Sequence, residues 1–312
     1  MIVRRAHRVL VQGITGRQGT FWTGKMIEYG TRVVGGVNPK KAGETHLGLP
    51  VFASAADAAK NLGKDGGFDV SVLFVPPLGA RAAALDAIAA GAKLLVMLTE
   101  HVPAQDVMYL LAAAKAVGAQ VVGPNTAGLV TPGECFVGIM PAFNRNVFRP
   151  GRVGVISRSG SLGTLVCLDL TRAGLGQSAF IGVGGDAIVG TTSRDAMEIF
   201  ERDPGTDAVV LVGEIGGAAE ETAAEYAASM TKPVVAFIAG RAAPVGKRMG
   251  HAGAIVLGAR GTYDSKRRAL EKAGVEVLDL PSGLAPALTR ALARTASANP
   301  SFARQSQPEK IA

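Results

Sequence analysis

Residues 8–20 read RVLVQGITGRQGT, an apolar run that leads directly into a glycine-rich turn. The run over 8–12 predicts a short buried strand, and the residues after the turn predict a helix that continues to Tyr29 and ends at Gly30. A second strand is predicted over 32–37. A strand, a glycine-rich turn, a helix and a second strand are typical of the unit that opens a Rossmann-type domain.

The turn and the end of the second strand indicate which ligand this unit would bind. Gly13, Gly16 and Gly19 are spaced GxxGxxG, whereas most dinucleotide folds have GxGxxG. Near the place where NAD sites usually have an acidic residue, this chain has Lys40 and Lys41. Two ammonium groups suit a ligand with an extra phosphate, such as NADP or coenzyme A. A solvated turn is the alternative interpretation of the same two lysines.

The alternation of apolar runs and helical segments continues along the chain and then begins again. In the first half the further predicted strands are 69–75, 93–98 and 120–122. In the second half they are 152–156, 179–183, 207–212, 233–239 and 275–278. We therefore predict an α/β protein with a Rossmann-type domain over 1–130, a linker over 131–150, a second doubly wound domain over 151–294 and a disordered tail over 295–312.

Composition and charge narrow the function. The net charge is +8 over 312 residues, but the longest basic run is only Lys266–Arg268 and no aromatics are interleaved with it, which disfavours nucleic-acid binding. Cys135 and Cys167 lie far apart, so neither a disulfide framework nor a metal site is expected. No apolar stretch reaches the roughly 18 residues of a membrane span, and residues 1–7 are too short for a signal peptide. We expect a cytoplasmic protein.

The second half contains a candidate anion site. The loop after the predicted strand 152–156 consists of Ser157, Arg158, Ser159, Gly160 and Ser161, and it opens a helix. The amino terminus of a helix presents unpaired N–H groups and the positive end of its dipole. This loop is therefore a candidate seat for phosphate or carboxylate.

The glycine-rich segment 240–256 contains a candidate nucleophile. It follows the predicted strand 233–239, and its single histidine, His251, lies between Gly250 and Gly253. Small neighbours leave the imidazole within reach of another molecule, and histidine can form a covalent intermediate in a group transfer. The alternative is a partly buried histidine that makes only a structural hydrogen bond.

Several long motifs closely resemble the α subunits of the succinyl-CoA synthetase family, which are nucleoside-diphosphate-forming acid–thiol ligases. They run in the family's order and span roughly residues 8–294. The motifs are QGITGRQGTF at 12–21, VGGV at 34–37, THLGLPVF at 45–52, GPN at 123–125, VGVISRSG at 153–160, GEIGG at 213–217 and RMGHAGAI at 248–255. The resemblance implies a Rossmann-type CoA-binding domain followed by a flavodoxin-like doubly wound ligase domain.

The resemblance also implies a role for each matching residue. His251 would be transiently phosphorylated, and Glu214 would hold the other nitrogen of its ring. The segment Ser157–Ser161 would hold phosphate beside the histidine. The residues implied to contact coenzyme A are Thr15, Gly16, Arg17, Gln18, Lys41, Leu98, Thr99 and Glu100. A partner β subunit would carry an ATP-grasp site for ATP or GTP with Mg²⁺, in an αβ or α2β2 assembly.

The implied reaction has three steps, and the sequence departs from the family where the acid would bind. A nucleotide phosphorylates His251, the phosphoryl group passes to a carboxylic acid, and coenzyme A displaces phosphate from the acyl phosphate. The family tyrosine linked to the carboxylate substrate is Thr164 here, and the following glutamate is Leu165. Trp22 and Thr126 also depart from the pattern near coenzyme A. Succinate is the first expectation for the acid, and malate or another small acid is the alternative.

Two other classes of function stay open at this point. A CoA-binding regulatory protein without turnover would explain the changes at Thr164 and Leu165, although His251 and Glu214 are intact. A nicotinamide dehydrogenase would explain the opening unit alone, by analogy of fold.

Overall fold

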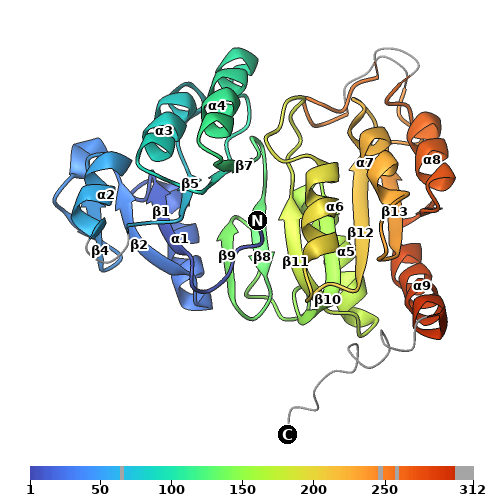
Figure 1. The fold of residues 1–312 in the computed structure, drawn as a ribbon. Coiled ribbons are helices and arrows are strands. Elements are labelled where there is room, and N and C mark those ends of the chain that lie inside the picture. The colour runs from blue at the N-terminus through green and yellow to red at the C-terminus, as the bar shows by residue number, and fades with distance from the viewer. Residues whose placement is uncertain (64–66, 245–248, 257–259, 299–312) are drawn as a thin grey trace, which may run out of the picture.

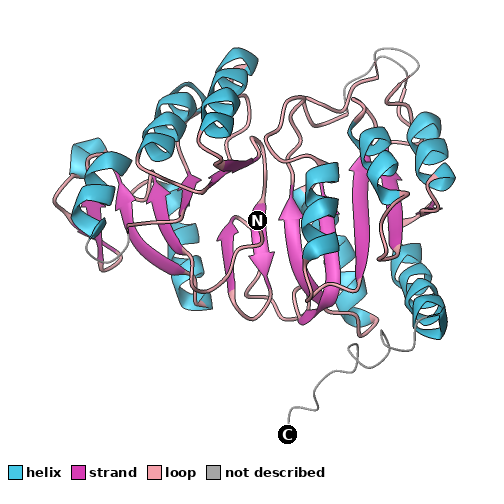
Figure 2. Cartoon of the chain, in the orientation of Figure 1, coloured by secondary structure: helices cyan, strands magenta, loops and turns pink. Residues whose placement is uncertain are grey.

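The computed structural model describes residues 1–63, 67–244, 249–256 and 260–298 (Figure 1). These residues form two seven-stranded sheets that lie side by side, with the amino terminus between them. Helices cover the faces of both sheets, as Figure 2 shows. The predicted α/β class is confirmed.

The first sheet has the strand order of a Rossmann domain. Its strands are β1 (Arg8–Gln12), β2 (Arg32–Val37), β3 (Thr45–His46), β4 (Leu49–Phe52), β5 (Val70–Leu73), β6 (Leu94–Met97) and β7 (Gln120–Val122). The order is β3-β4-β2-β1-β5-β6-β7, parallel except for β3, which pairs antiparallel with β4. The helices are α1 (Arg17–Tyr29), α2 (Ala55–Leu62), α3 (Pro77–Ala89) and α4 (Ala104–Ala116). Helices α2, α3 and α4 pack side by side, whereas α1 lies against the second domain.

The second sheet has a flavodoxin-like centre. Its strands are β8 (Gly128–Thr131), β9 (Cys135–Gly138), β10 (Pro150–Ser157), β11 (Gln177–Gly182), β12 (Ala208–Glu214), β13 (Val234–Ala239) and β14 (Glu276–Leu278). The helices are α5 (Gly160–Arg172), α6 (Ser193–Arg202), α7 (Ala219–Ala227), α8 (Tyr263–Lys272) and α9 (Leu284–Ala298). The order is β14-β13-β12-β10-β11-β8-β9, and the five strands from β10 to β14 are parallel. Helices α5 and α9 pack together, and α6, α7 and α8 form a second row.

The predicted linker over 131–150 is wrong in its first part. It contains the end of β8 and the whole of β9, which form a hairpin that extends the second sheet through antiparallel pairing of β8 with β11. All four residues of β9 are buried, and Phe136 is fully buried. The Thr-Pro-Gly sequence at 131–133 therefore belongs to a hairpin turn, which composition alone does not distinguish from a linker.

The predicted disordered tail also begins too early. Residues 295–298 belong to α9, and 299–312 lie outside the described residues. Small residues such as Ala291 on α9 are buried against the sheet, so an alanine-rich segment continues the helix although it lacks large apolar side chains.

The hairpin joins the cores of the two domains. Phe136 contacts the Tyr29 ring edge-to-face, with centroids 5.5 Å apart. The Thr31 hydroxyl donates to the Phe136 carbonyl at 2.8 Å, and the Thr131 hydroxyl donates to the Val3 carbonyl at 2.6 Å. One cluster of buried apolar side chains continues from β1 through the hairpin to β12. The two sheets are thus packed through a shared core, which fixes their facing edges.

Both cysteines are free and buried. Burial raises the pKa of the Cys135 thiol to about 12, and it also raises the pKa of the Cys167 thiol. Among the helices of the described residues, none has the length and hydropathy that crossing a bilayer requires. Within the same part of the chain, no group of three or more histidine, cysteine or acidic side chains is placed to hold a metal ion.

Candidate active site

The carboxyl ends of β10 and β12 meet at the point where the second sheet changes winding direction. From β10 the chain passes through α5 to β11 on one side, and it then crosses to β12 on the other side. Open α/β sheets bind ligands at such a point. Ser157 ends β10 and Glu214 ends β12, so the predicted anion seat and the predicted carboxylate lie on neighbouring strands.

His251 and Glu214 are brought together although 37 residues separate them. The Nδ1 atom of His251 lies 2.8 Å from Oε2 of Glu214. Glu214 is 10% exposed and His251 is 28% exposed, so the pair is sheltered but the ring is within reach from outside. Since a carboxylate oxygen can only accept, the bond places a proton on Nδ1. The Nε2 atom has no hydrogen-bond partner among the described residues, and it is therefore the free nitrogen.

The surroundings of His251 raise its pKa. The largest cause is the hydrogen bond that the ring donates to Glu214, which favours the charged ring, and burial opposes it. The charge of Glu214 also raises the pKa, Arg158 lowers it, and Asp186 raises it. A neutral ring with a free Nε2 is the nucleophilic form, so the carboxylate orients the ring and at the same time shifts its titration upward.

We therefore expect the reactivity of His251 to increase with pH through a midpoint above the ordinary value of about 6.5. The folded-state pKa is raised, so the His251–Glu214 contact stabilises the fold fully below that ordinary value and is lost as pH rises through the folded-state pKa. Diethylpyrocarbonate, which modifies neutral imidazole, would measure this at pH 5 to 9 by mass spectrometry of the His251 peptide. N-acetylhistidine is the reference, and a midpoint at or below that of the reference would contradict the expectation.

Three glycines make room for the histidine and its neighbours. A Cβ atom on Gly185 would lie 2.5 Å from Cγ of His251, and one on Gly253 would lie 2.5 Å from Nη2 of Arg158. Gly216 has φ +93°, and a Cβ there would lie 2.1 Å from the Gly253 carbonyl oxygen. Only glycine fits at these positions without displacing backbone, the imidazole or the Arg158 guanidinium.

A cavity of about 700 Å³ connects the two domains at this site. From the first domain it is lined by Gln18, Leu98, Thr99 and Glu100. From the second domain it is lined by Arg158, Ser159, Gly160, Ser161 and His251. The structure thus brings residues predicted for coenzyme A, residues predicted for phosphate and the predicted nucleophile to one cavity. Its volume is within the usual range for small-molecule sites.

The other residues predicted to contact coenzyme A lie outside the cavity wall. Gly16 and Arg17 begin α1 and are exposed. The Thr15 hydroxyl accepts a hydrogen bond from Asn38 Nδ2 at 2.5 Å. Lys41 is exposed, 3.6 Å from Glu44. These residues surround the glycine turn. A ligand that contacts both them and the residues of the cavity wall would therefore extend from the turn into the cavity.

The turn itself depends on close backbone contact. A Cβ atom on Gly19 would lie 2.2 Å from the Gly13 carbonyl oxygen. We expect Gly19→Ala to displace the start of α1, lower the free energy of unfolding by about 1–3 kcal/mol and weaken coenzyme A binding. Gly24→Ala is the matched control, because a Cβ at that position of α1 meets nothing within 4 Å. The control should be neutral or more stable by up to about 1 kcal/mol. Urea unfolding and calorimetric titration with coenzyme A measure both quantities, and equal effects would contradict the expectation.

The residues predicted to hold phosphate take different positions. Ser159 caps α5, and its hydroxyl accepts from the Leu162 N–H at 3.3 Å. Ser157 is fully buried and donates to the Ser159 carbonyl at 2.6 Å. The Arg158 guanidinium points to Glu214, with Nε 3.3 Å from Oε1. The N–H groups at the start of α5, around Gly160 and Ser161, therefore remain the feature at the cavity that suits an anion.

The predicted substrate residue Thr164 does not line the cavity. Its hydroxyl donates to the Gly160 carbonyl of its own helix at 2.8 Å. Leu165 is 55% exposed on the outer side of α5. Of the other departures, Trp22 Nε1 donates to Gln18 Oε1 at 3.0 Å, and the Thr126 hydroxyl donates to the Gly182 carbonyl. Trp22 therefore supports a cavity residue, and Thr126, which itself lines the cavity, bonds to the end of β11.

Sequence reasoning missed two residues at or behind the site, Asn125 and Lys266. Asn125 lines the cavity, and its Nδ2 donates to Asp186 at 3.0 Å. Its φ of +56° places it in the left-handed region of a turn, which the GPN motif in the sequence does not by itself indicate. Lys266, the first residue of the basic run 266–268, is fully buried, and its ammonium group donates to the Glu214 carbonyl.

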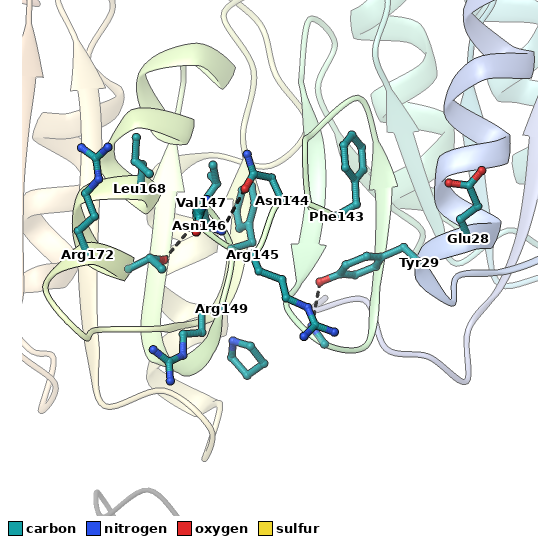
Figure 3. Close-up of a pocket in the computed structure, with 14 residues that line it drawn as sticks. Glu28, Tyr29, Phe143, Asn144, Arg145, Asn146, Val147, Arg149, Leu168 and Arg172 are labelled. Carbon is teal, nitrogen blue, oxygen red and sulfur yellow. Dashed lines mark hydrogen bonds between the residues drawn. The ribbon is translucent and has the colours of Figure 1, made fainter. Parts of the chain in front are cut away.

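A larger cavity lies at the opposite end of α5. Its volume is about 1160 Å³, and it is bordered by Arg145, Arg149 and Arg172 around Tyr29 and Phe143 (Figure 3). The Tyr29 hydroxyl accepts from the Gly133 N–H at 2.9 Å. None of the predicted site residues lines it. The candidate site is therefore chosen by the clustering of reactive groups and not by the size of the cavity.

Comparison with known proteins gives the family. The CoA binding domain family matches residues 4–101, and the CoA-ligase family matches residues 156–276. The ADP-forming succinate–CoA ligase subunit alpha of Methanothermobacter thermautotrophicus is 50% identical over 277 residues, which is 89% of this chain and 92% of the relative. The chain belongs to the succinate–CoA ligase α-subunit family.

One relative is named for a different acid. The ADP-forming sulfoacetate-CoA ligase subunit SauD of Bilophila wadsworthia is 43% identical, over 94% of this chain and 99% of the relative. Among solved structures, ATP citrate lyase from Methanothrix soehngenii in complex with citrate and coenzyme A matches with a TM-score of 0.86. It is 21% identical, and the match covers all of this chain and 57% of that one, so it supports the fold alone.

Proposed function

We propose that this chain is the α subunit of an ADP-forming ligase that joins succinate to coenzyme A through a phosphohistidine and an acyl phosphate. The observation that carries the proposal is the His251–Glu214 pair at a cavity shared with the residues predicted for coenzyme A and with the start of α5. The names of relatives up to 50% identical support succinate and ADP formation. The match of the first domain to the CoA binding domain family supports coenzyme A as a substrate.

The geometry supports a specific course of transfer. Nε2 of His251 forms a bond to the γ-phosphorus of ATP as the bond to the ADP oxygen breaks. The substrate carboxylate then takes the phosphoryl group from Nε2, and the coenzyme A thiolate attacks the acyl carbon and expels phosphate. Nδ1 keeps its proton throughout and donates it to the Glu214 carboxylate, whose charge stabilises the ring when it is positively charged. The N–H groups at the start of α5 stabilise the charge of the phosphoryl oxygens.

The relatives are named as subunits alpha, which points to a second kind of subunit. We infer a companion β subunit that carries an ATP-grasp domain with ATP or GTP and Mg²⁺, in an αβ or α2β2 assembly located in the cytoplasm. The exposed side of His251 supports this, since a nucleotide on another chain can approach the ring there.

The identity of the acid is the least constrained part of the proposal. With Thr164 and Leu165 in place of a tyrosine and a glutamate, α5 presents neither an aromatic ring nor a charge at these two positions. A relative 43% identical is named for sulfoacetate. Malate and other small acids are therefore tested beside succinate.

The experiment uses the chain co-expressed with its companion subunit. ATP labelled at the γ-phosphate should transfer label to the peptide that contains His251, and the label should be acid-labile. Succinate and coenzyme A together should discharge the label as inorganic phosphate and form the thioester. If malate or sulfoacetate discharged the label with coenzyme A and succinate did not, the proposed acid would change but the proposed class of enzyme would stand. Label on another residue, or no ADP release with any acid, would overturn the ligase proposal and favour a regulatory CoA-binding protein. Hydride transfer with NAD(P) would favour a dehydrogenase.

A further inference from the structure

A fully buried ion pair lies directly behind the active-site carboxylate. Lys266, on α8, and Glu220, in the first turn of α7, are both 0% exposed. The ammonium group of Lys266 donates to the carboxylate of Glu220. It also donates to the backbone carbonyls of Glu214 at 2.8 Å and Gly216 at 2.7 Å. All three donors of the ammonium group are thus satisfied.

The pair holds the backbone of Glu214 from both sides. Oε1 of Glu220 accepts from the Glu214 N–H at 3.2 Å, and Lys266 binds the Glu214 carbonyl. Glu214 is the last residue of β12, and the sheet holds the next residue through the Ile215 N–H, which donates to the Ala239 carbonyl at 3.0 Å. Lys266 binds the carbonyl of Gly216, where the backbone turns with φ +93°. Both polar groups of the Glu214 backbone and the turn after it are therefore fixed by the same ion pair.

Arg158 links the ion pair to the carboxylate itself. Its Nε lies 3.3 Å from Oε1 of Glu214, and its Nη1 lies 4.0 Å from Oε1 of Glu220. Its Nη1 also donates to the Gly216 carbonyl at 3.3 Å. One oxygen of Glu214 thus faces Arg158 while the other faces His251. Rotation of the Glu214 carboxylate away from the ring would separate it from Arg158.

Stability is a poor explanation for such a pair. Removing two charges from water is costly, and replacing a buried ion pair by apolar residues is often neutral or stabilising. A pair whose contacts converge on one catalytic carboxylate is better explained by positioning.

We propose that Lys266 and Glu220 are positioning residues that hold Glu214 so that its carboxylate meets Nδ1 of His251. Arg158 transmits this constraint to the Glu214 side chain. The imidazole is oriented by Glu214 at the end of β12, whose other carboxylate oxygen faces Arg158 after β10. The effect on turnover rests on the proposed function, but the effect on the ring does not.

The test replaces both members of the ion pair by apolar residues in the complex with the companion subunit. The variant is Lys266→Met with Glu220→Met, so that no unpaired charge remains buried. The matched control is Arg152→Met with Asp207→Leu, a bidentate pair with bonds of 2.6 and 2.7 Å that joins the amino ends of β10 and β12. Thermal unfolding checks that each variant folds. The readouts are the pH midpoint of diethylpyrocarbonate modification at His251, the rate of phosphorylation, and KM for coenzyme A.

We expect the ion-pair variant to lower the modification midpoint toward the ordinary value of about 6.5. Phosphorylation should slow by roughly 10- to 100-fold, as when residues that orient a catalytic group are lost, with KM for coenzyme A unchanged. The control pair should leave the midpoint and the rate as in the wild type. An unchanged midpoint in a folded ion-pair variant, or an equal shift in the control, would overturn the proposal.

A second variant covers the case in which the double variant does not fold. Glu220→Gln keeps an oxygen that can accept from the Glu214 N–H but removes the charge. It should shift the midpoint and the rate in the same direction by a smaller amount, and an unchanged midpoint would overturn the proposal. The modification assay needs no substrate. A shifted midpoint in a complex that turns over no acid would therefore support the positioning role while the ligase proposal fails.

Discussion

Replacing His251 by asparagine is expected to abolish phosphate incorporation from ATP and to reduce kcat for thioester formation by roughly 10⁴-fold or more. Asparagine is close in size and polarity, but its amide nitrogen has no basic lone pair to attack phosphorus. The cavity and Glu214 would be retained, so KM for coenzyme A should change little. Filter-bound label and a thioester assay on the purified complex measure both effects.

The control for this substitution is His7→Asn. His7 lies outside the cavity, where its Nδ1 accepts from the Arg4 N–H at 3.0 Å. That variant should incorporate label at the wild-type rate. Retention of more than a few per cent of turnover by His251→Asn would mean that the transfer does not pass through this ring.

Glu214→Gln is expected to reduce the rate of phosphorylation by roughly 10²- to 10⁴-fold, as when the partner of a catalytic histidine loses its charge. The amide can present its N–H group to Nδ1, which would favour the tautomer with the proton on Nε2 and remove the nucleophilic lone pair. The amide also leaves Arg158 without its closest carboxylate, 3.3 Å away. The pKa of His251 should fall, because its largest cause of elevation is removed.

Glu276→Gln serves as the matched control for this change. Glu276 lies on β14 of the same sheet, where it accepts from Arg290 at 2.6 Å near the surface. Its loss should leave phosphorylation unaffected. If Glu214→Gln labelled as fast as this control, the carboxylate would be structural only. If the pH midpoint of His251 modification did not fall, the hydrogen bond to Glu214 would not be the cause of the raised pKa.

Local patterns predicted the regular parts of the fold because their causes are local. The run 8–12 corresponds to β1, and the glycine turn precedes α1, which ends at Gly30 with φ +107°. The spacing of Gly13 and Gly19 also has a local cause, since the two residues contact each other across the turn. The hairpin β8–β9 was missed because its strands are short and its partner, β11, is some 50 residues distant in the chain.

The site was predictable in its residue types but not in its arrangement. His251 and Glu214 were identified through motifs of the family, and their 2.8 Å contact depends on the tertiary fold. Lys266 shows the limit most clearly. It shares a basic run with Arg267, whose charge pairs with Asp279 at 2.6 Å near the surface, yet Lys266 itself faces inward. Which of two consecutive basic residues is buried depends on the helix face that the sheet covers.

The hairpin that joins the two domains has a practical consequence for protein engineering. In a chimera of two relatives joined at residue 130, most of β8 would come from one parent and β9 from the other, since β8 ends at Thr131 and β9 begins at Cys135. Phe136 would then meet a foreign Tyr29 counterpart across the junction. Exchange of modules between family members should keep β8, β9 and the first helix from a single parent, with the crossover placed between residues 139 and 149.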